Sequence, residues 1–252
     1  DLHALEWSCL PAGTDVFAFQ GALKPGKGLA DLIEPDDAGG FRFKQNRFFA
    51  TNAGVVVAES DTGAWWTDDV FPLPDVSSGP PPGAIGVIDH NRPNPVLLQT
   101  NTAIVTTPPD GAVIAGDVSA LTCTGASFAY AEGIFLSGNA PAVDIEGCDH
   151  VVLEHDAVVS SDTGVFINGG TENALVGVRV LFGGGGATLV TTGVRIDGGS
   201  GHSLSNVTVV NASSIGVSLS ATAGASLDDV RIFDMGFGTG TSDPTRRGVK
   251  LA

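Results

Sequence analysis

The densest group of side chains that could perform acid–base chemistry is Glu154-His155-Asp156, which closely follows Asp149 and His150. Two neighbouring carboxyl groups can act as the acid and the base of glycoside hydrolysis, and their separation decides the stereochemical outcome. The same side chains could instead bind a metal ion. Glu154, His155 and Asp156 are therefore the candidate catalytic residues, and a solvated corner of an acidic protein is the alternative that requires no function.

A repeated sequence pattern predicts the elements that hold this group. A tetrapeptide Gly-x-x-[Ile/Leu] begins at Gly111, Gly133, Gly164, Gly193, Gly216 and Gly248. A second motif alternates with it and begins at Cys123, Cys148, Leu175, Leu204 and Leu227. Side chains on a strand point alternately to opposite faces, so the apolar positions of each motif face inward and the variable positions between them face outward. Stacked coils with these strands predict a right-handed parallel β-helix, with a third strand in segments such as Thr188–Thr192.

The spacing between motifs indicates where the coils carry insertions. The segment from the first motif to the second is nearly constant in length, whereas the return segment varies several-fold. Insertions are thus confined mostly to one corner, and in solenoids such loops often mark the binding face. The glycine that opens each first motif fits a corner that needs a positive φ or a close backbone approach.

The chain is predicted to be all-β, with about five to six coils of β-helix over residues 85–252. The Pro-rich stretch 72–84 is interpreted as a linker. Residues 1–71 lack the repeat but include strand-like segments such as Phe41-Arg-Phe, which favour a small β-rich cap or attachment region. A cap would cover the strand edges that an open terminal coil exposes.

Composition excludes several partners. The formal net charge is −16 and no basic segment stands out, so binding to nucleic acid or to an anionic membrane surface is disfavoured. No run of eighteen apolar residues predicts a membrane span. No pattern predicts a cofactor or a metal centre, so none is expected.

Three cysteines do not form a disulfide framework. Cys123 and Cys148 share a motif position in successive coils and are expected to be vertical neighbours, at a spacing that a disulfide can bridge. The equivalent positions elsewhere are leucines, so packing as small apolar side chains is the favoured role.

Phe135 and Phe166 occupy outward positions of successive first motifs and are predicted to lie one above the other. Exposed aromatic side chains on a flat sheet imply that something covers them. A loop, the N-terminal region or further copies of the chain are the possible covers.

The coil length, the two alternating motifs and the polar residues after the first motif (Ser137, Asn168, Asp197 and Ser220) resemble the pectate-lyase-like family of β-helices, which includes phage tailspikes and tail fibres. The resemblance implies a parallel homotrimer with Phe135 and Phe166 at its interfaces. Lyases of this family use clustered acidic calcium ligands with a nearby Arg or Lys base. The outward positions of the motifs are mostly Phe, Ser, Thr, Val and Arg, so no catalytic residue is carried over.

The resulting hypothesis is a virion structural protein, a tail-fibre or tailspike-like projection that acts in host attachment. Residues 1–71 would contact other virion proteins, the β-helix could contact a host surface glycan, and the location would be the virion or the extracellular space. The alternative is an extracellular polysaccharide hydrolase or lyase, and a third hypothesis is a bacterial surface adhesin. The absence of a recognisable active site favours a protein that is not an enzyme.

Overall fold

A computed structural model of the protein describes residues 33–35, 41–43, 70–73, 79–80, 85–106, 112–139, 141–182, 191–233 and 247–251. Every regular element in these ranges is a strand. The same ranges hold no helix that could cross a lipid bilayer. Strands β1 (Ile33–Pro35) and β2 (Phe41–Phe43) form a small antiparallel pair, and the remaining strands form three parallel sheets.

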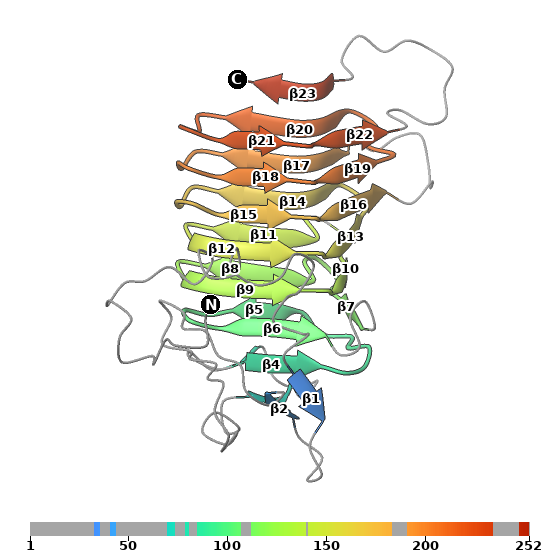
Figure 1. Cartoon of the computed structure of the whole chain (residues 1–252). Coiled ribbons are helices and arrows are strands. Elements are labelled where there is room, and N and C mark those ends of the chain that lie inside the picture. The colour runs from blue at the N-terminus through green and yellow to red at the C-terminus, as the bar shows by residue number, and fades with distance from the viewer. Residues whose placement is uncertain are drawn as a thin grey trace.

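The three sheets are the long sides of a coiled column (Figure 1). Sheet I contains β3 (Val70–Pro72), β4 (Ile85–Ile88), β6 (Ala103–Thr106), β9 (Ser127–Glu132), β12 (Asp149–Glu154), β15 (Ala174–Val176), β18 (Ser203–Ser205) and β21 (Ser226–Asp228). Sheet II contains β7 (Val113–Ala115), β10 (Phe135–Ser137), β13 (Ala157–Ser160), β16 (Arg179–Phe182), β19 (Thr208–Val210) and β22 (Arg231–Phe233). Sheet III contains β5 (Val96–Leu98), β8 (Leu121–Thr124), β11 (Val143–Glu146), β14 (Thr163–Asn168), β17 (Thr192–Asp197), β20 (Ile215–Ser220) and β23 (Arg247–Leu251).

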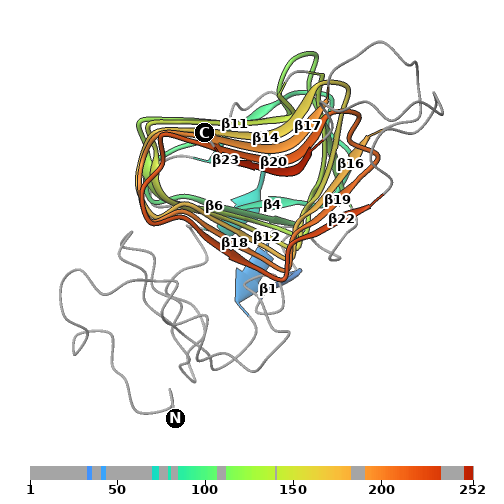
Figure 2. The same cartoon turned by 90° about the horizontal axis from the view of Figure 1, so that it is seen from above.

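Each coil runs from sheet I to sheet II to sheet III before the chain returns to sheet I one level higher. Seen from above, the chain turns counter-clockwise as it rises toward the viewer, which makes the coil right-handed (Figure 2). The triplets run from β6–β7–β8 to β21–β22–β23. The predicted all-β, right-handed parallel β-helix of about five to six coils is therefore confirmed.

The core is built from columns of apolar side chains, one from each coil. In sheet III, Ile145 pairs with Ile167, Ile167 with Ile196, and Ile196 with Leu219. These side chains are almost completely removed from solvent, and burying one such side chain stabilises the fold by about 1.5–3 kcal/mol.

The shortest coils share one length. Hydrogen bonds between equivalent corners of successive coils join residues that are 22 apart in the sequence, as from Ala126 to Cys148 and from Ile134 to Asp156. The same interval separates the register partners Ile145 and Ile167. This interval is the length of the undecorated coil, and longer coils carry insertions.

The longest insertions occur at the corner between sheets II and III, as the spacing predicted, and a shorter one separates β6 from β7 at the corner between sheets I and II. Strand β14 begins almost directly after β13, whereas residues 183–191 separate β16 from β17. The glycines at this corner are required by close packing. A Cβ on Gly164 would collide with the Val180 side chain, and one on Gly193 would collide with Val209. The expected close backbone approach is therefore confirmed for these two positions.

The predicted alignment of the first motif was wrong for its first two copies. Gly111 and Gly133 precede β7 and β10 of sheet II, whereas Gly164 and the later glycines belong to sheet III. Phe135 consequently pairs with Val113 and Ala157, and Phe166 pairs with Asp144 and Arg195. The two phenylalanines lie on different sheets and are not stacked, because both sheets use a glycine-led apolar strand.

The second motif also differs from its prediction. Leu175 lies in β15 of sheet I, whereas Val180 lies in β16 of sheet II, so the motif bends around a corner and supplies two strands. Gly177 forms this corner with φ of 65°. The third strand of each coil is therefore supplied by the second motif itself. The sequence had placed this strand in segments such as Thr188–Thr192, but β17 begins only at Thr192, and residues 188–190 lie outside the described residues.

Cys123 and Cys148 form a disulfide with a Cα–Cα distance of 6.4 Å. The favoured role as separate apolar side chains was therefore wrong. The predicted register was also wrong, because Cys123 of β8 pairs with Ile145. Cys148 lies at the next corner, between β11 and β12, which turns its side chain back toward the coil below.

Candidate functional site

The three candidate catalytic residues, Glu154, His155 and Asp156, point in different directions in the structure. Glu154 is the last residue of β12 and points to the outside of sheet I, where Glu132 of β9 is its register partner. His155 follows with φ of 56° at the corner between sheets I and II, and its ring is largely exposed. Asp156 turns inward, is 1% exposed, and accepts a 2.8 Å hydrogen bond from the Ile134 backbone N–H. The three side chains do not converge on one point.

Glu154 instead belongs to a cluster with Tyr130 and Glu132. The Tyr130 hydroxyl lies 2.9 Å from Glu132 Oε2 and 2.8 Å from Glu154 Oε2. Burial, followed by the negative charges of the two glutamates, raises the Tyr130 pKa well above its ordinary value, so the phenol stays protonated. Tyr130 and Glu132 are only 4% and 6% exposed. The cluster ties adjacent coils together and offers little access to a polymeric substrate.

A more accessible set of polar side chains covers the outer face of sheet III. Asp144, Phe166 and Arg195 form one outward column on β11, β14 and β17, since they are consecutive register partners. A second outward column contains Glu146, Asn168 and Asp197, and Ser220 continues it. Asn168, Asp197 and Ser220, which follow the first motif in the sequence, therefore stack on one another. Ser137 follows the same motif but lies in sheet II and is not part of this column.

Asp144 and Glu146 form a carboxyl pair on β11. They are two residues apart on one strand, so their side chains leave the same face about 6.6 Å from each other. Burial, followed by the nearby charge of Glu146, raises the Asp144 pKa above its ordinary value. Asp144 is half-buried, and its Oδ1 has no hydrogen-bond partner within the described part of the chain. Two carboxyl groups in different environments can take the separate roles of proton donor and proton acceptor.

Phe166 and Arg195 form the neighbouring part of this face. The Arg195 guanidinium lies 4.9 Å from the centre of the Phe166 ring, an arrangement that is favourable because the face of an aromatic ring attracts cations. Arg195 Nη2 also pairs with Asp197 Oδ2. The sheet therefore places an aromatic ring one coil above Asp144 and a paired cation one coil above that ring.

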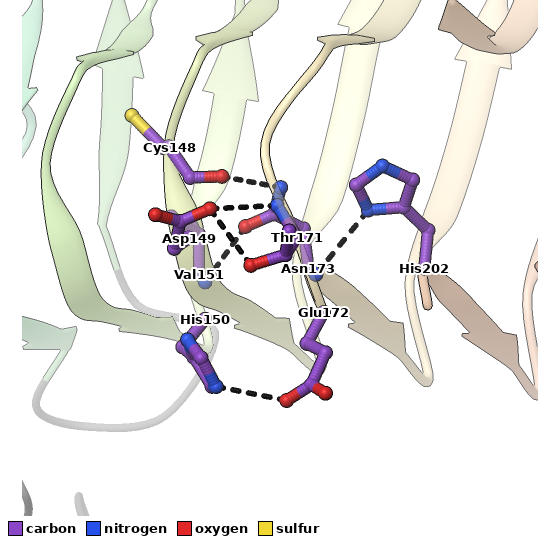
Figure 3. Close-up of polar contacts among 8 residues, drawn as sticks. All are labelled: Cys148, Asp149, His150, Val151, Thr171, Glu172, Asn173 and His202. Carbon is purple, nitrogen blue, oxygen red and sulfur yellow. Dashed lines mark hydrogen bonds and ion pairs between the residues drawn. The ribbon is translucent and has the colours of Figure 1, made fainter. Parts of the chain in front are cut away.

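The corner from sheet III to sheet I fixes the ends of these strands (Figure 3). Outside, Thr171 donates hydrogen bonds of 2.7 and 2.8 Å from its backbone N–H and its hydroxyl to Asp149 Oδ1. His150 Nε2 lies 2.8 Å from Glu172 Oε2, and the Phe128 ring stacks on His150 with centroids 4.7 Å apart. The outer surface of this corner is therefore built from contacts between successive coils.

Inside the same corner, two buried polar side chains connect three coils. Asn173 Oδ1 accepts from the Val151 N–H at 2.9 Å, and its Nδ2 donates to the Cys148 carbonyl at 2.7 Å. The Asn173 N–H donates to His202 Nδ1 at 3.3 Å. Burial lowers the His202 pKa, while the Gly198 carbonyl and the Asp149 charge oppose this effect. These contacts, visible in Figure 3, make the corner a rigid support for sheet III.

In the described ranges, no three His, Cys, Asp or Glu side chains group as metal ligands. The acidic face of sheet III was missed in the sequence, where the outward strand positions were assigned mostly Phe, Ser, Thr, Val and Arg. The signal that reveals it is the length of the undecorated coil, because Asp144 precedes Phe166, and Glu146 precedes Asn168, by one such interval.

The sequence matches no protein-family model and no curated protein. The fold is similar to that of a Parabacteroides merdae protein provisionally described as a glycosyl hydrolase, with a TM-score of 0.50 and 12% sequence identity. The match covers 64% of this chain and 85% of that chain. At this identity the similarity establishes the β-helix fold alone.

Proposed function

We propose that the protein is an extracellular glycan hydrolase whose reaction takes place on the outer face of sheet III. The observation that carries the proposal is the Asp144–Glu146 pair, in which Asp144 has a raised pKa and lies beside the outward ring of Phe166. The provisional description of the structural neighbour as a glycosyl hydrolase is compatible with this function. The sequence-derived polysaccharide-degrading alternative is thereby preferred, with a different pair of carboxyl groups.

Each carboxyl group has a defined role in the proposed reaction. Burial and the charge of Glu146 raise the Asp144 pKa, which favours its protonated form. In the proposed reaction Asp144 donates its proton to the glycosidic oxygen as the bond from that oxygen to the anomeric carbon breaks. Glu146 accepts a proton from the water molecule whose oxygen bonds to the anomeric carbon. The strand rise places the backbones of the two residues about 6.6 Å apart, and carboxyl groups that keep this spacing would leave room for the water, as in inverting enzymes. The product is therefore expected to have inverted anomeric configuration.

The test is a reducing-end assay of the full chain on a panel of neutral, amino and uronic polysaccharides, with NMR of the first anomer formed. Asp144→Asn and Glu146→Gln should each reduce turnover by about 10²–10⁴-fold. Asp228→Asn, which removes an exposed carboxylate from sheet I, is the matched control and should retain activity. Loss of activity in Glu154→Gln but not in Asp144→Asn would transfer the chemistry to the Tyr130 cluster and overturn the assignment.

A second candidate function is the attachment fibre predicted from the sequence. It is favoured by the outward and exposed Phe233 ring on sheet II, because exposed aromatic side chains often mark contacts between chains. A three-fold ring presents two different faces of each protomer to its neighbours, so Phe135 on sheet II and Phe166 on sheet III can both be interface residues. Virion partners of residues 1–71 and a host glycan remain part of this proposal.

Light scattering on a size-exclusion column separates the two candidates. A trimer that cleaves no glycan would support the fibre, and a monomer that cleaves one would exclude it. Phe135→Ser and Phe166→Ser should dissociate a trimer if these side chains lie at its interfaces.

A further inference from the structure

The charges around sheet III are strongly biased toward one sign. Carboxyl groups lie on the face and at both of its corners, namely Asp117, Asp144, Glu146, Asp149, Asp162, Glu172 and Asp197. Between β8 and β20, the described part of this surface contains one arginine or lysine, Arg195, and Asp197 already pairs with it. Lys250 of β23 lies beyond this stretch. The other exposed arginines of known position, Arg179 and Arg231, lie on sheet II.

The face also shows which chemical group it accommodates. The Arg195 guanidinium rests on Phe166 and contacts Asp197, so a cation is held between an aromatic ring and a carboxylate. One coil below, Phe166 has Asp144 as its register partner. Glu146 adds a second, exposed carboxylate next to Asp144. Phe166 thus has carboxyl groups on the coil below it as well as on the coil above it. In the described part of this face, no basic side chain lies beside the lower pair.

Resting on the proposed hydrolase function, we infer that the glycan bound along sheet III carries amino groups rather than carboxylates. A protonated amine would be attracted to the carboxylates of Glu146 and Asp162, which lie on this face and at its corner. A uronic acid polymer would bring one negative charge per sugar toward these groups. Repulsion between like charges is strongest at low ionic strength, because the Debye length is about 10 Å at 0.1 M salt.

The experiment measures binding of the full chain, by calorimetry, to three hexasaccharides of equal length: glucosamine, N-acetylglucosamine and galacturonate oligomers. At 50 mM NaCl the glucosamine oligomer should bind at least tenfold more tightly than the galacturonate oligomer. The difference should shrink at 300 mM NaCl, where charges are screened. Asp162→Asn should weaken glucosamine binding by about two- to fivefold, as expected for one exposed charge pair.

Asp228→Asn distinguishes a defined site from general attraction of a polycation to an acidic protein. The variant removes one charge from sheet I, and its affinity should be unchanged. Equal losses in Asp162→Asn and Asp228→Asn, or equal or tighter binding of galacturonate, would overturn the inference. Cleavage of galacturonate or of a neutral glycan would overturn the inference and leave the hydrolase function intact, whereas no binding and no cleavage of any glycan would remove both.

Discussion

Replacing His202 with asparagine should make the stability of the β-helix less sensitive to acid. His202 is fully buried and accepts a hydrogen bond from the Asn173 N–H through Nδ1. Protonation of that nitrogen would abolish the bond and leave a positive charge in the core. Asparagine at this position can accept the same bond through its side-chain oxygen, just as Asn173 accepts the Val151 N–H one coil below.

The magnitude follows from proton linkage. Burial lowers the His202 pKa from the ordinary value of 6.5, so between pH 6.5 and the lowered pKa the unfolded chain binds a proton that the folded chain does not. The free energy of unfolding should therefore fall with decreasing pH by up to about 1.4 kcal/mol per pH unit from this residue. Above pH 6.5 neither state is protonated and the residue contributes no slope.

Urea denaturation followed by circular dichroism at pH 5, 6 and 7 measures the effect. His202→Asn should be less acid-sensitive than the wild type by this amount, whereas His155→Asn, at the exposed corner position, should keep the wild-type slope. Equal slopes for the wild type and His202→Asn between pH 5 and 7 would refute the reasoning, because they would mean that His202 binds its proton equally well in both states.

Three further predictions test the other contacts. Replacing Cys123 and Cys148 together by serine should lower the free energy of unfolding by about 3.5 kcal/mol, from the loop-closure entropy of a disulfide spanning 25 residues; unchanged urea midpoints for the double variant and the oxidised protein would exclude a stabilising bond. Gly193→Ala should lower the melting temperature much more than Gly125→Ala. Of these two positions, only Gly193 lies so close to the neighbouring coil that a Cβ would collide with it. At Gly125 the alanine would have only the cost of a positive φ, about 1–2 kcal/mol. Asp156→Ala should destabilise the fold by about 1–3 kcal/mol by leaving a buried backbone N–H unpaired, and Asp156→Asn should recover most of this loss in the same denaturation assay, whereas equal losses would show that the hydrogen bond is unimportant.

The fold was predictable because its core imposes a simple pattern. Inward positions such as Val194 and Ile196 must be apolar, while Arg195 between them faces solvent, and this alternation is visible in the sequence. The corner at which one strand ends and the next begins was harder to locate from the sequence. Leu175 and Val178 lie on either side of the bend at Gly177, so one continuous motif in the sequence is two strands in space.

The candidate site could not be found by the same pattern. The glycine motif identifies β14 and β17, but the equivalent positions before β8 and β11 are Ala120 and Ala142, both buried. These two coils were therefore invisible to the motif, and Asp144 was not placed beside Phe166. Cys123 and Cys148 were assigned to core packing because the sequence does not show how the corner directs the Cys148 side chain, and the disulfide depends on that direction.

The constant length of the undecorated coil gives the molecule a fixed unit of length. Each such coil raises the column by one strand spacing, about 4.8 Å, so the chain advances along the axis far more slowly than it winds around it. Side chains one coil apart in the sequence, such as Asp144 and Phe166, are therefore evenly spaced along one face of the column. Loops inserted between sheets II and III leave the spacing of these side chains unchanged. A ligand with a regular repeat can therefore be matched by changing one column of outward residues, without altering the core that sets the interval.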